Sequence, residues 1–371
     1  MLYFDHAATT PVHPEVIKKM DQVSKRDFGN PSSVYSSGRA AKSVVELARN
    51  EIAKMIGAKP SEIYFTGSGT ESNNIVLWSL LYQENKHVIT SAIEHPAVLK
   101  VLDELSFFGI SYDILPVDST GLVNPSDLKS VIRKDTALVS IMFVNNEVGT
   151  IQPIEDLIDI AKSFSIPFHS DCVQAVGKLP ISINTIEADY MSFSAHKFYG
   201  PKGIGFLYKK EGNHLKPLII GGSQESSLRA GTENISGIAG LGVAAQLVST
   251  NLNDRIKHLL QLEDYFKTKL TDQHPEIIFH GNHSKHVPGL CSIAIPNHKN
   301  EVVLAKLDRN GIEVSNGSAC SSGVVGLSPI LSAMGIEDLA NQSTIRVSFG
   351  RENTIADVSK LIESLSEILN G

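Results

Sequence analysis

The chain contains the segment Ser192-Phe193-Ser194-Ala195-His196-Lys197-Phe198-Tyr199-Gly200-Pro201-Lys202-Gly203. An apolar strand is expected at 190–193, and it leads into Ser194, His196 and Lys197 before a loop that contains glycine and proline. Proteins of the α/β class place their chemistry in loops at strand ends. A lysine that is desolvated there loses its proton more easily, and the free amine can form a Schiff base. A single loop lysine is otherwise a solvated surface residue, so the interpretation depends on the rest of the chain.

Short apolar runs alternate with helical patterns on both sides of this segment. Strands are expected at 63–66, 87–90, 110–115, 137–144, 167–170, 190–193 and 204–208. Helices are expected at 15–28, 39–56, 73–82, 96–107, 125–132 and 154–164. Strands that are spaced by helices form a mostly parallel sheet covered on both faces. The predicted fold class is therefore α/β, with a mostly parallel, seven-stranded sheet in a large domain.

The pattern changes after residue 208. A long helix is expected at 235–270, followed by strands at 290–295 and 344–349 and helices at 301–310 and 355–369. These elements predict a smaller α+β domain. We expect an N-terminal arm at 1–14 that packs with the small domain, a large domain at 15–254 and the small domain at 255–371.

Composition excludes several classes of protein. The net charge of −7, without a long basic run, argues against nucleic acid as a ligand. The N-terminus lacks the features of a secretory signal, and no apolar run approaches the ~20 residues of a membrane helix. The cysteines Cys172, Cys291 and Cys320 lie far apart without a CxxC pair, and the 13 histidines show no ligand spacing, so no metal site is expected. A reducing cytoplasm fits this cysteine usage best.

A glycine-rich turn, Gly67-Ser68-Gly69-Thr70-Glu71-Ser72, connects an expected strand to an expected helix. Free backbone N–H groups and the helix dipole favour an anion at such a turn. The turn is neither a Walker A loop nor a dinucleotide fingerprint, and by itself it is equally consistent with a helix cap. Together with Ser194 and His196 it predicts a phosphate-binding site opposite Lys197.

Asp171 ends an apolar strand, where a carboxylate is costly unless it is paired. The protonated ring nitrogen of pyridoxal phosphate is one suitable partner, and Gln174, three residues on, is placed to reach the ring hydroxyl. A helix-capping role for Asp171 is the alternative.

Two further residues occupy chemically useful positions at strands. His95 precedes a proline that opens a helix, so it can stack on a flat ring or move a proton, or it can be structural. Arg346 alternates with apolar residues on a strand and can bind a carboxylate in bidentate fashion, or form a surface ion pair. Asn145 follows the expected strand at 137–144.

Cys320 lies in the small-residue loop Asn316-Gly317-Ser318-Ala319-Cys320-Ser321-Ser322-Gly323. Buried cysteines normally sit in apolar elements, as Cys291 does. The loop thiol is therefore the candidate nucleophile.

Together these segments resemble the cysteine desulfurases, a group of the aminotransferase class V enzymes with the fold-type I pyridoxal phosphate architecture. The resemblance spans nearly the whole chain in order. It rests on Phe4-Asp5-His6-Ala7-Ala8-Thr9-Thr10-Pro11, Gly29-Asn30-Pro31-Ser32-Ser33, Thr66-Gly67-Ser68-Gly69-Thr70-Glu71-Ser72-Asn73-Asn74, Glu94-His95, Val144-Asn145-Asn146-Glu147-Val148-Gly149-Thr150-Ile151-Gln152-Pro153, Asp171 with Gln174, Ser194-Ala195-His196-Lys197, Arg229-Ala230-Gly231-Thr232, the Cys320 loop and Arg346.

The resemblance implies a cofactor, pyridoxal 5'-phosphate, bound by the domain at 15–254, and a role for each matched residue. Lys197 holds the cofactor as a Schiff base and later removes the substrate's α-proton. His95 stacks on the ring and deprotonates the substrate thiol, and Cys320 takes the sulfur as a persulfide. The other implied contacts are those of Asp171 with the ring nitrogen, Gln174 with the ring oxygen, Gly69, Thr70, Ser194 and His196 with the phosphate, Thr232 with the phosphate of a second subunit, and Asn145 and Arg346 with the substrate carboxylate.

The resemblance also implies partners. The substrate is L-cysteine, the enzyme is a homodimer, and the acceptors are proteins such as an iron–sulfur scaffold or a tRNA thiolase. Cys320 is also placed to ligate an iron–sulfur cluster transiently. An aminotransferase or a selenocysteine lyase of the same fold, and an inactive scaffold that docks on an assembly protein, remain alternatives.

Overall fold

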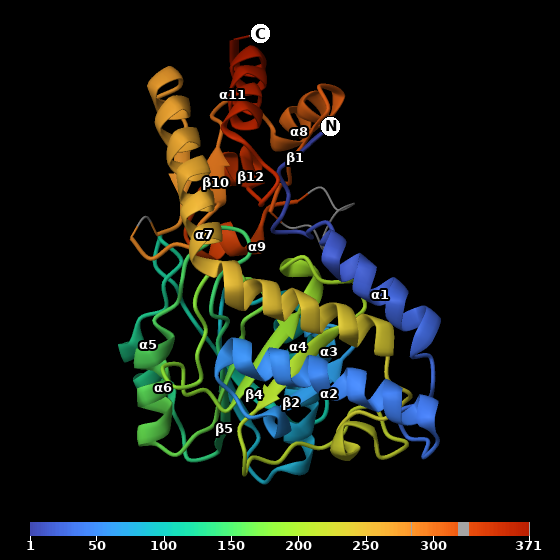
Figure 1. Ribbon diagram of the computed structural model, residues 1–371. Coiled ribbons are helices and arrows are strands. Elements are labelled where there is room, and N and C mark those ends of the chain that lie inside the picture. Colours follow the sequence, from blue (N-terminus) through green and yellow to red (C-terminus); the bar gives the residue numbers. More distant parts are fainter. Residues whose placement is uncertain (283, 318–325, 371) are drawn as a thin grey trace.

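The structure is a computed structural model that describes residues 1–282, 284–317 and 326–370. Its elements form two lobes, with the large sheet in the lower lobe and both chain termini in the upper lobe (Figure 1). The predicted α/β class is confirmed.

The lower lobe is built on a seven-stranded sheet. The strand order is β2 (Ile63–Thr66), β8 (Gly205–Lys209), β7 (Tyr190–Ser194), β6 (Phe168–Asp171), β5 (Thr136–Ser140), β3 (His87–Ser91) and β4 (Ser111–Leu115). Only β8 runs against the others, because it is antiparallel to both β2 and β7 while the remaining pairs are parallel. The sheet is therefore mostly parallel, as predicted.

Helices cover both faces of this sheet. They are α1 (Pro14–Arg26), α2 (Ser36–Ile56), α3 (Gly69–Trp78), α4 (Pro96–Ser106), α5 (Pro125–Val131) and α6 (Ile154–Ser163). Successive residues of a strand point to opposite faces. On β3, Val88 accordingly joins the apolar cluster under α3 and α4, whereas Ile89 joins the cluster that contains residues of α2 and α6.

Helix α7 (Ile235–Gln273) connects the two lobes (Figure 1). Its first half places Ile238 and Leu241 in the core of the large sheet, and its second half places Leu262 and Phe266 in the core of the upper lobe. By length and composition α7 would suffice to cross a membrane, contrary to the sequence expectation, but half of its most apolar stretch is buried in the fold. The proposed domain boundary near residue 255 lies within this helix.

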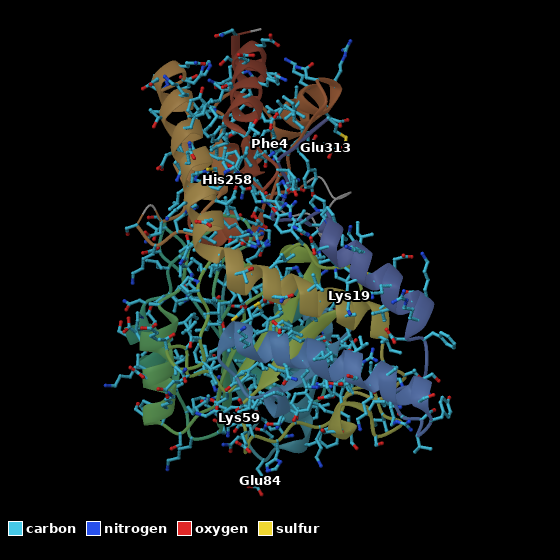
Figure 2. All side chains as sticks on the ribbon, in the orientation of Figure 1. Phe4, Lys19, Lys59, Glu84, His258 and Glu313 are labelled. Carbon is cyan, nitrogen blue, oxygen red and sulfur yellow. The ribbon has the colours of Figure 1, made fainter. Side chains whose placement is uncertain are left out.

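The upper lobe has a three-stranded antiparallel sheet in the order β12 (Thr344–Ser348), β10 (Leu290–Ala294) and β9 (Ile278–His280). Its helices are α8 (Asn300–Arg309), α9 (Pro329–Ala333), α10 (Asp338–Gln342) and α11 (Ile355–Asn370). The N-terminal arm joins this lobe, because β1 (Leu2–Tyr3) pairs in parallel with β11 (Ile312–Glu313). Figure 2 shows Phe4 and Glu313 together there, and the Phe4 N–H donates to the Glu313 carbonyl.

In the part of the chain that the structure describes, short 3-10 helices also lie at Pro60–Glu62, Ser79–Tyr82, Ala195–Lys197 and Gln224–Ser227.

Two elements next to the strand ends differ from their predicted bounds. Helix α3 begins at Gly69 and not at residue 73, because the Ser68 hydroxyl accepts a hydrogen bond from the Glu71 N–H at 3.1 Å and caps the helix. Strand β5 ends at Ser140 and not at residue 144, since its pairing with β3 stops there. Both differences affect the functional site, because they set which residues begin the adjoining loops.

Candidate active site

A cavity of about 510 Å³ lies at the carboxyl ends of β3, β6 and β7, where a parallel sheet presents its ligand-binding edge. The N-terminal arm contributes Ala7 and Ala8 to its wall, and the upper lobe contributes Gly317 and Ile330. The predicted site residues that line it are Gly69, Thr70, His95, Asp171, Gln174, Ser194, His196, Lys197 and Arg346.

Lys197 is held by the N-terminal arm. Its Nζ donates to the carbonyl oxygens of Ala7 at 2.7 Å and of Ala8 at 2.8 Å. The arm is fixed in turn to the lysine loop, because the Thr10 N–H and hydroxyl both donate to the His196 carbonyl at 2.9 Å. The amine at the end of Lys197 therefore has a defined position.

Asp171 is buried at the end of β6, with 6% of its surface exposed. Its Oδ2 accepts from Asn73 Nδ2 at 2.7 Å, and its Oδ1 accepts from the Val173 N–H at 3.0 Å. These two donors fix the plane of the carboxylate. Gln174 lies beside it and donates from Nε2 to the Ala7 carbonyl at 2.8 Å.

One end of the cavity is suited to an anion. The first turn of α3 presents Gly69 and Thr70 there, and the first N–H groups of a helix have no partners within the helix. A side chain at residue 69 would not fit, because a Cβ would lie 2.6 Å from Val173 Cγ2. Ser194 lines the same cavity, and burial lowers the pKa of His196 to about 4, so that ring is neutral at pH 7.

His95 caps α4. Its Nδ1 accepts from the Ala97 N–H at 3.1 Å, so the hydrogen of the neutral ring lies on Nε2. A ring in this tautomer donates from Nε2. The expectation that His95 deprotonates the substrate thiol stays a prediction.

Arg346 is a buried arginine on β12, with 2% of its surface exposed. It pairs with Asp5 Oδ1 at 2.7 Å and donates to the carbonyls of Asn146 at 2.7 Å and Gly317 at 2.9 Å. Its Nε has no hydrogen-bond partner among the residues that the structure describes. The arginine therefore ties the arm to the upper lobe, and it forms part of the cavity wall.

Of the predicted site residues that the structure describes, Asn145 and Thr232 do not line this cavity. Asn145 is fully buried and turned to the backbone: its Nδ2 donates to the Ile93 carbonyl, and its Oδ1 accepts from the N–H groups of Glu147 and Val148. The neighbouring Asn146 lines the cavity in its place. Thr232 is exposed and outside the cavity of its own chain, and Cys320 falls outside the described residues.

Two carboxyl groups in the cavity wall, Glu94 and Glu147, were missed by sequence reasoning. Glu94 Oε1 accepts from the Ser91 hydroxyl at 2.6 Å and from the Met142 N–H at 2.9 Å, while Oε2 has no partner within the described chain. Burial raises the pKa of Glu94 to about 8, so the group is protonated at pH 7. Burial also raises the pKa of Glu147, whose Oε2 accepts from the Ser328 hydroxyl. The position of Glu94 directly before His95 indicated that it is near the site, although the pair gives no sign that Glu94 is buried.

Glu94→Gln is expected to change how stability depends on pH. The carboxyl has a higher pKa in the folded chain than in the unfolded chain, so its favourable effect is complete below about pH 4.5 and is lost as pH rises through about 8. Glutamine has no such loss. As the pH rises from about 5.5 to 8.5, we expect the free energy of unfolding of Glu94→Gln to increase by about 3 kcal/mol relative to that of wild type. Urea unfolding at each pH measures this difference. The exposed Glu155→Gln is the control, and a constant difference across this range would contradict the assignment.

The comparisons with known proteins agree with this geometry. The aminotransferase class-V family model matches residues 2–361. A cysteine desulfurase IscS of Dictyoglomus turgidum is 43% identical over 371 residues, which cover 99% of this chain and 94% of that protein. One from Methanosarcina thermophila is 41% identical over 371 residues, with 99% and 92% coverage.

Solved structures give the same result. A NifS-like protein matches with a TM-score of 0.94 at 37% identity and covers 100% of this chain and 99% of its own. A NifS-like protein from Rickettsia africae matches with a TM-score of 0.91 at 33% identity and full coverage of both chains. The chain therefore belongs to the aminotransferase class-V family and, within it, to the cysteine desulfurases.

Proposed function

We propose that the chain is a pyridoxal 5'-phosphate enzyme that converts L-cysteine to L-alanine and transfers the sulfur to Cys320 as a persulfide. The observation that supports this most is the convergence of Lys197, Asp171 and His95 on one cavity with the anion-binding start of α3. Enzymes of this family depend on that cofactor.

The residues of the cavity fit the cofactor. The donors of Gly69, Thr70, Ser194 and His196 suit its phosphate, and the missing Cβ of Gly69 leaves space beside Val173. Asp171 suits the ring nitrogen, Gln174 the ring oxygen and Lys197 the aldehyde. When bound, the cofactor supplies an electron sink for the charge left when the substrate's α-proton departs.

The chain's own groups then orient the substrate and move its proton. The Lys197 amine, displaced by the substrate amine, is placed to take the α-proton. The guanidinium of Arg346 in the cavity wall suits the substrate carboxylate, and Asn146 is the asparagine available to assist it. His95 donates from Nε2, which favours the substrate sulfur as thiolate.

Sulfur transfer is assigned to Cys320. As its thiolate attacks the substrate sulfur, a sulfur–sulfur bond forms and the carbon–sulfur bond breaks. The electron pair of that bond stays with the carbon fragment, which gains a proton and leaves as alanine.

The proposal includes partners outside this chain. We propose a homodimer in which the exposed Thr232 reaches the phosphate site of the second copy. The persulfide would then pass, in the cytoplasm, to an acceptor protein such as an iron–sulfur scaffold or a tRNA thiolase. Neither nucleic acid nor a membrane takes part.

The test is release of sulfide and alanine from L-cysteine with a thiol reductant. Wild type is expected to release the two in equal amounts. Cys320→Ser is expected to lose about a thousandfold or more of both while it keeps the visible absorbance of the bound cofactor. Cys291→Ala is the matched control, because that thiol is buried in β10 and burial raises its pKa.

The outcomes separate the alternatives. A cofactor band without alanine from wild type would favour an aminotransferase and call for a screen of keto acids. Faster turnover of selenocysteine in competition with cysteine would favour a selenocysteine lyase. Full sulfide release by Cys320→Ser would refute the assigned nucleophile.

A further inference from the structure

Lys178 is a buried lysine that the proposed reaction does not use. Only 5% of its surface is exposed, and its Nζ donates to Gln174 Oε1 at 2.8 Å. Lys178 lies four positions after Gln174 in the chain, and both side chains are buried. Lys178 does not line the cavity, whereas Gln174 does.

Gln174 connects this lysine to Lys197 by hydrogen bonds. Gln174 Nε2 donates to the Ala7 carbonyl at 2.8 Å, and Lys197 Nζ donates to the same oxygen at 2.7 Å. The two ends of a glutamine amide have nearly the same shape, so only their partners decide which end is oxygen. A flipped amide would bring oxygen against the Ala7 oxygen and NH₂ against the Lys178 amine. The pair of partners, one donor and one acceptor, therefore determines the orientation of Gln174.

The surroundings of Lys178 are unfavourable for a lysine. Burial, reinforced by the cations Lys197, Arg255 and Arg346, holds the pKa of Lys178 well below its usual range. His6 is also near, since Lys178 contributes to the lowered pKa of that ring. An apolar side chain would fill this position as well as a lysine does, so packing alone does not explain a lysine here.

We infer that Lys178 is a positioning residue that fixes the Gln174 amide with its NH₂ group available to the cavity, which assigns that amide as a donor to the cofactor's ring oxygen. The inference rests on the proposed function, because the ligand that receives this hydrogen bond is the cofactor. It concerns orientation, so Lys178 acts through Gln174 and touches neither cofactor nor substrate.

The test is the pH titration of the visible absorbance of the bound cofactor in the holoenzyme. Lys178→Met removes the donor that faces Gln174 Oε1, so the Ala7 carbonyl alone then opposes a flip of the amide. Loss of a hydrogen-bond donor to the ring oxygen favours the protonated form of the bound cofactor. The titration midpoint is therefore expected to rise by about one pH unit, the size expected of one hydrogen bond. Lys178→Gln keeps a donor and is expected to restore the wild-type midpoint.

Gln174→Leu distinguishes orientation from a direct charge effect. If Lys178 acts through Gln174, then Gln174→Leu shifts the midpoint and adding Lys178→Met shifts it no further. Lys209→Met is the matched control, because that lysine also donates to a carbonyl, that of Asn213, and Asn213 does not line the cavity. Additive shifts in the double variant would overturn the inference.

The remaining outcomes are also decisive. If wild type shows the cofactor band and Lys178→Met leaves its titration midpoint unchanged, the inference is overturned and the proposed function is not. A wild-type chain that shows no cofactor band would overturn the proposed function and the inference with it. If Lys178→Met yields no folded protein, Lys178→Leu is titrated in its place, and failure of both to fold would show a structural role and refute the inference.

Discussion

Lys197→Ala is expected to lose both the visible absorbance of the cofactor and at least about a thousandfold of alanine release from cysteine. The Nζ of Lys197 is placed by the Ala7 and Ala8 carbonyls at the end of β7, and it has two duties in the proposed reaction. Loss of this amine removes the covalent attachment of the cofactor and the base for the α-proton together. Spectra and alanine assays of the purified variant measure the two effects separately.

Lys202→Ala is the control for this variant, since Lys202 belongs to the same loop and is exposed. It is expected to match wild type in both measurements. Added free amine should restore part of the activity of Lys197→Ala if proton transfer is the missing step. A Lys197→Ala protein that keeps its band and its alanine release would refute the role of Lys197.

Arg346→Leu is expected to lower the free energy of unfolding by about 3 to 5 kcal/mol, because it leaves the partners of a buried ion pair without compensation. The guanidinium pairs with Asp5 and donates to two carbonyls, so its loss frees the arm from the upper lobe. The KM for cysteine should also rise, since the donor proposed for the substrate carboxylate is gone. Urea unfolding and steady-state kinetics measure these two effects.

The control for Arg346→Leu is Arg309→Leu at the exposed end of α8, which should change neither quantity appreciably. Adding Asp5→Asn to Arg346→Leu should recover part of the lost stability, because it removes the unpaired carboxylate. Equal stability of wild type and Arg346→Leu would contradict a structural role for the pair.

The convergence of the main site residues could be predicted from the sequence. Asp171 and Lys197 follow expected strands of a parallel sheet, and the carboxyl ends of such strands meet at one edge. The same argument placed His95 there. These predictions needed only the order of strands and helices, which the apolar periodicity supplies over most of the large lobe.

The direction of individual side chains could not be predicted in this way. Asn145 and Asn146 are adjacent and chemically identical, yet the Asn145 side chain closes a turn with the N–H groups of Glu147 and Val148, and Asn146 lines the cavity. The choice depends on the backbone path after β5, where the strand ends earlier than its apolar pattern indicates. Glu94 was missed for a similar reason, because an acidic residue in a polar pair gives no sign of burial.

The pairing of β1 with β11 could not be predicted from the sequence pattern either, because each strand has only two residues. Its contacts join positions that are more than three hundred residues apart, and the Asp5–Arg346 pair spans 341. Such contacts depend on tertiary packing of the finished chain and not on local preference.

This long span affects when the protein becomes active during its synthesis. The arm that positions Lys197 is anchored by β11 and Arg346, which the ribosome makes near the end of the chain. At about 5 to 20 residues per second, Arg346 is added roughly 20 to 70 s after Asp5. When the large sheet of a nascent chain has left the ribosome, β11 and Arg346 are not yet made, so Lys197 is not yet positioned. Truncated products of interrupted translation would accordingly have the sheet and the lysine without a complete site for the reactive cofactor.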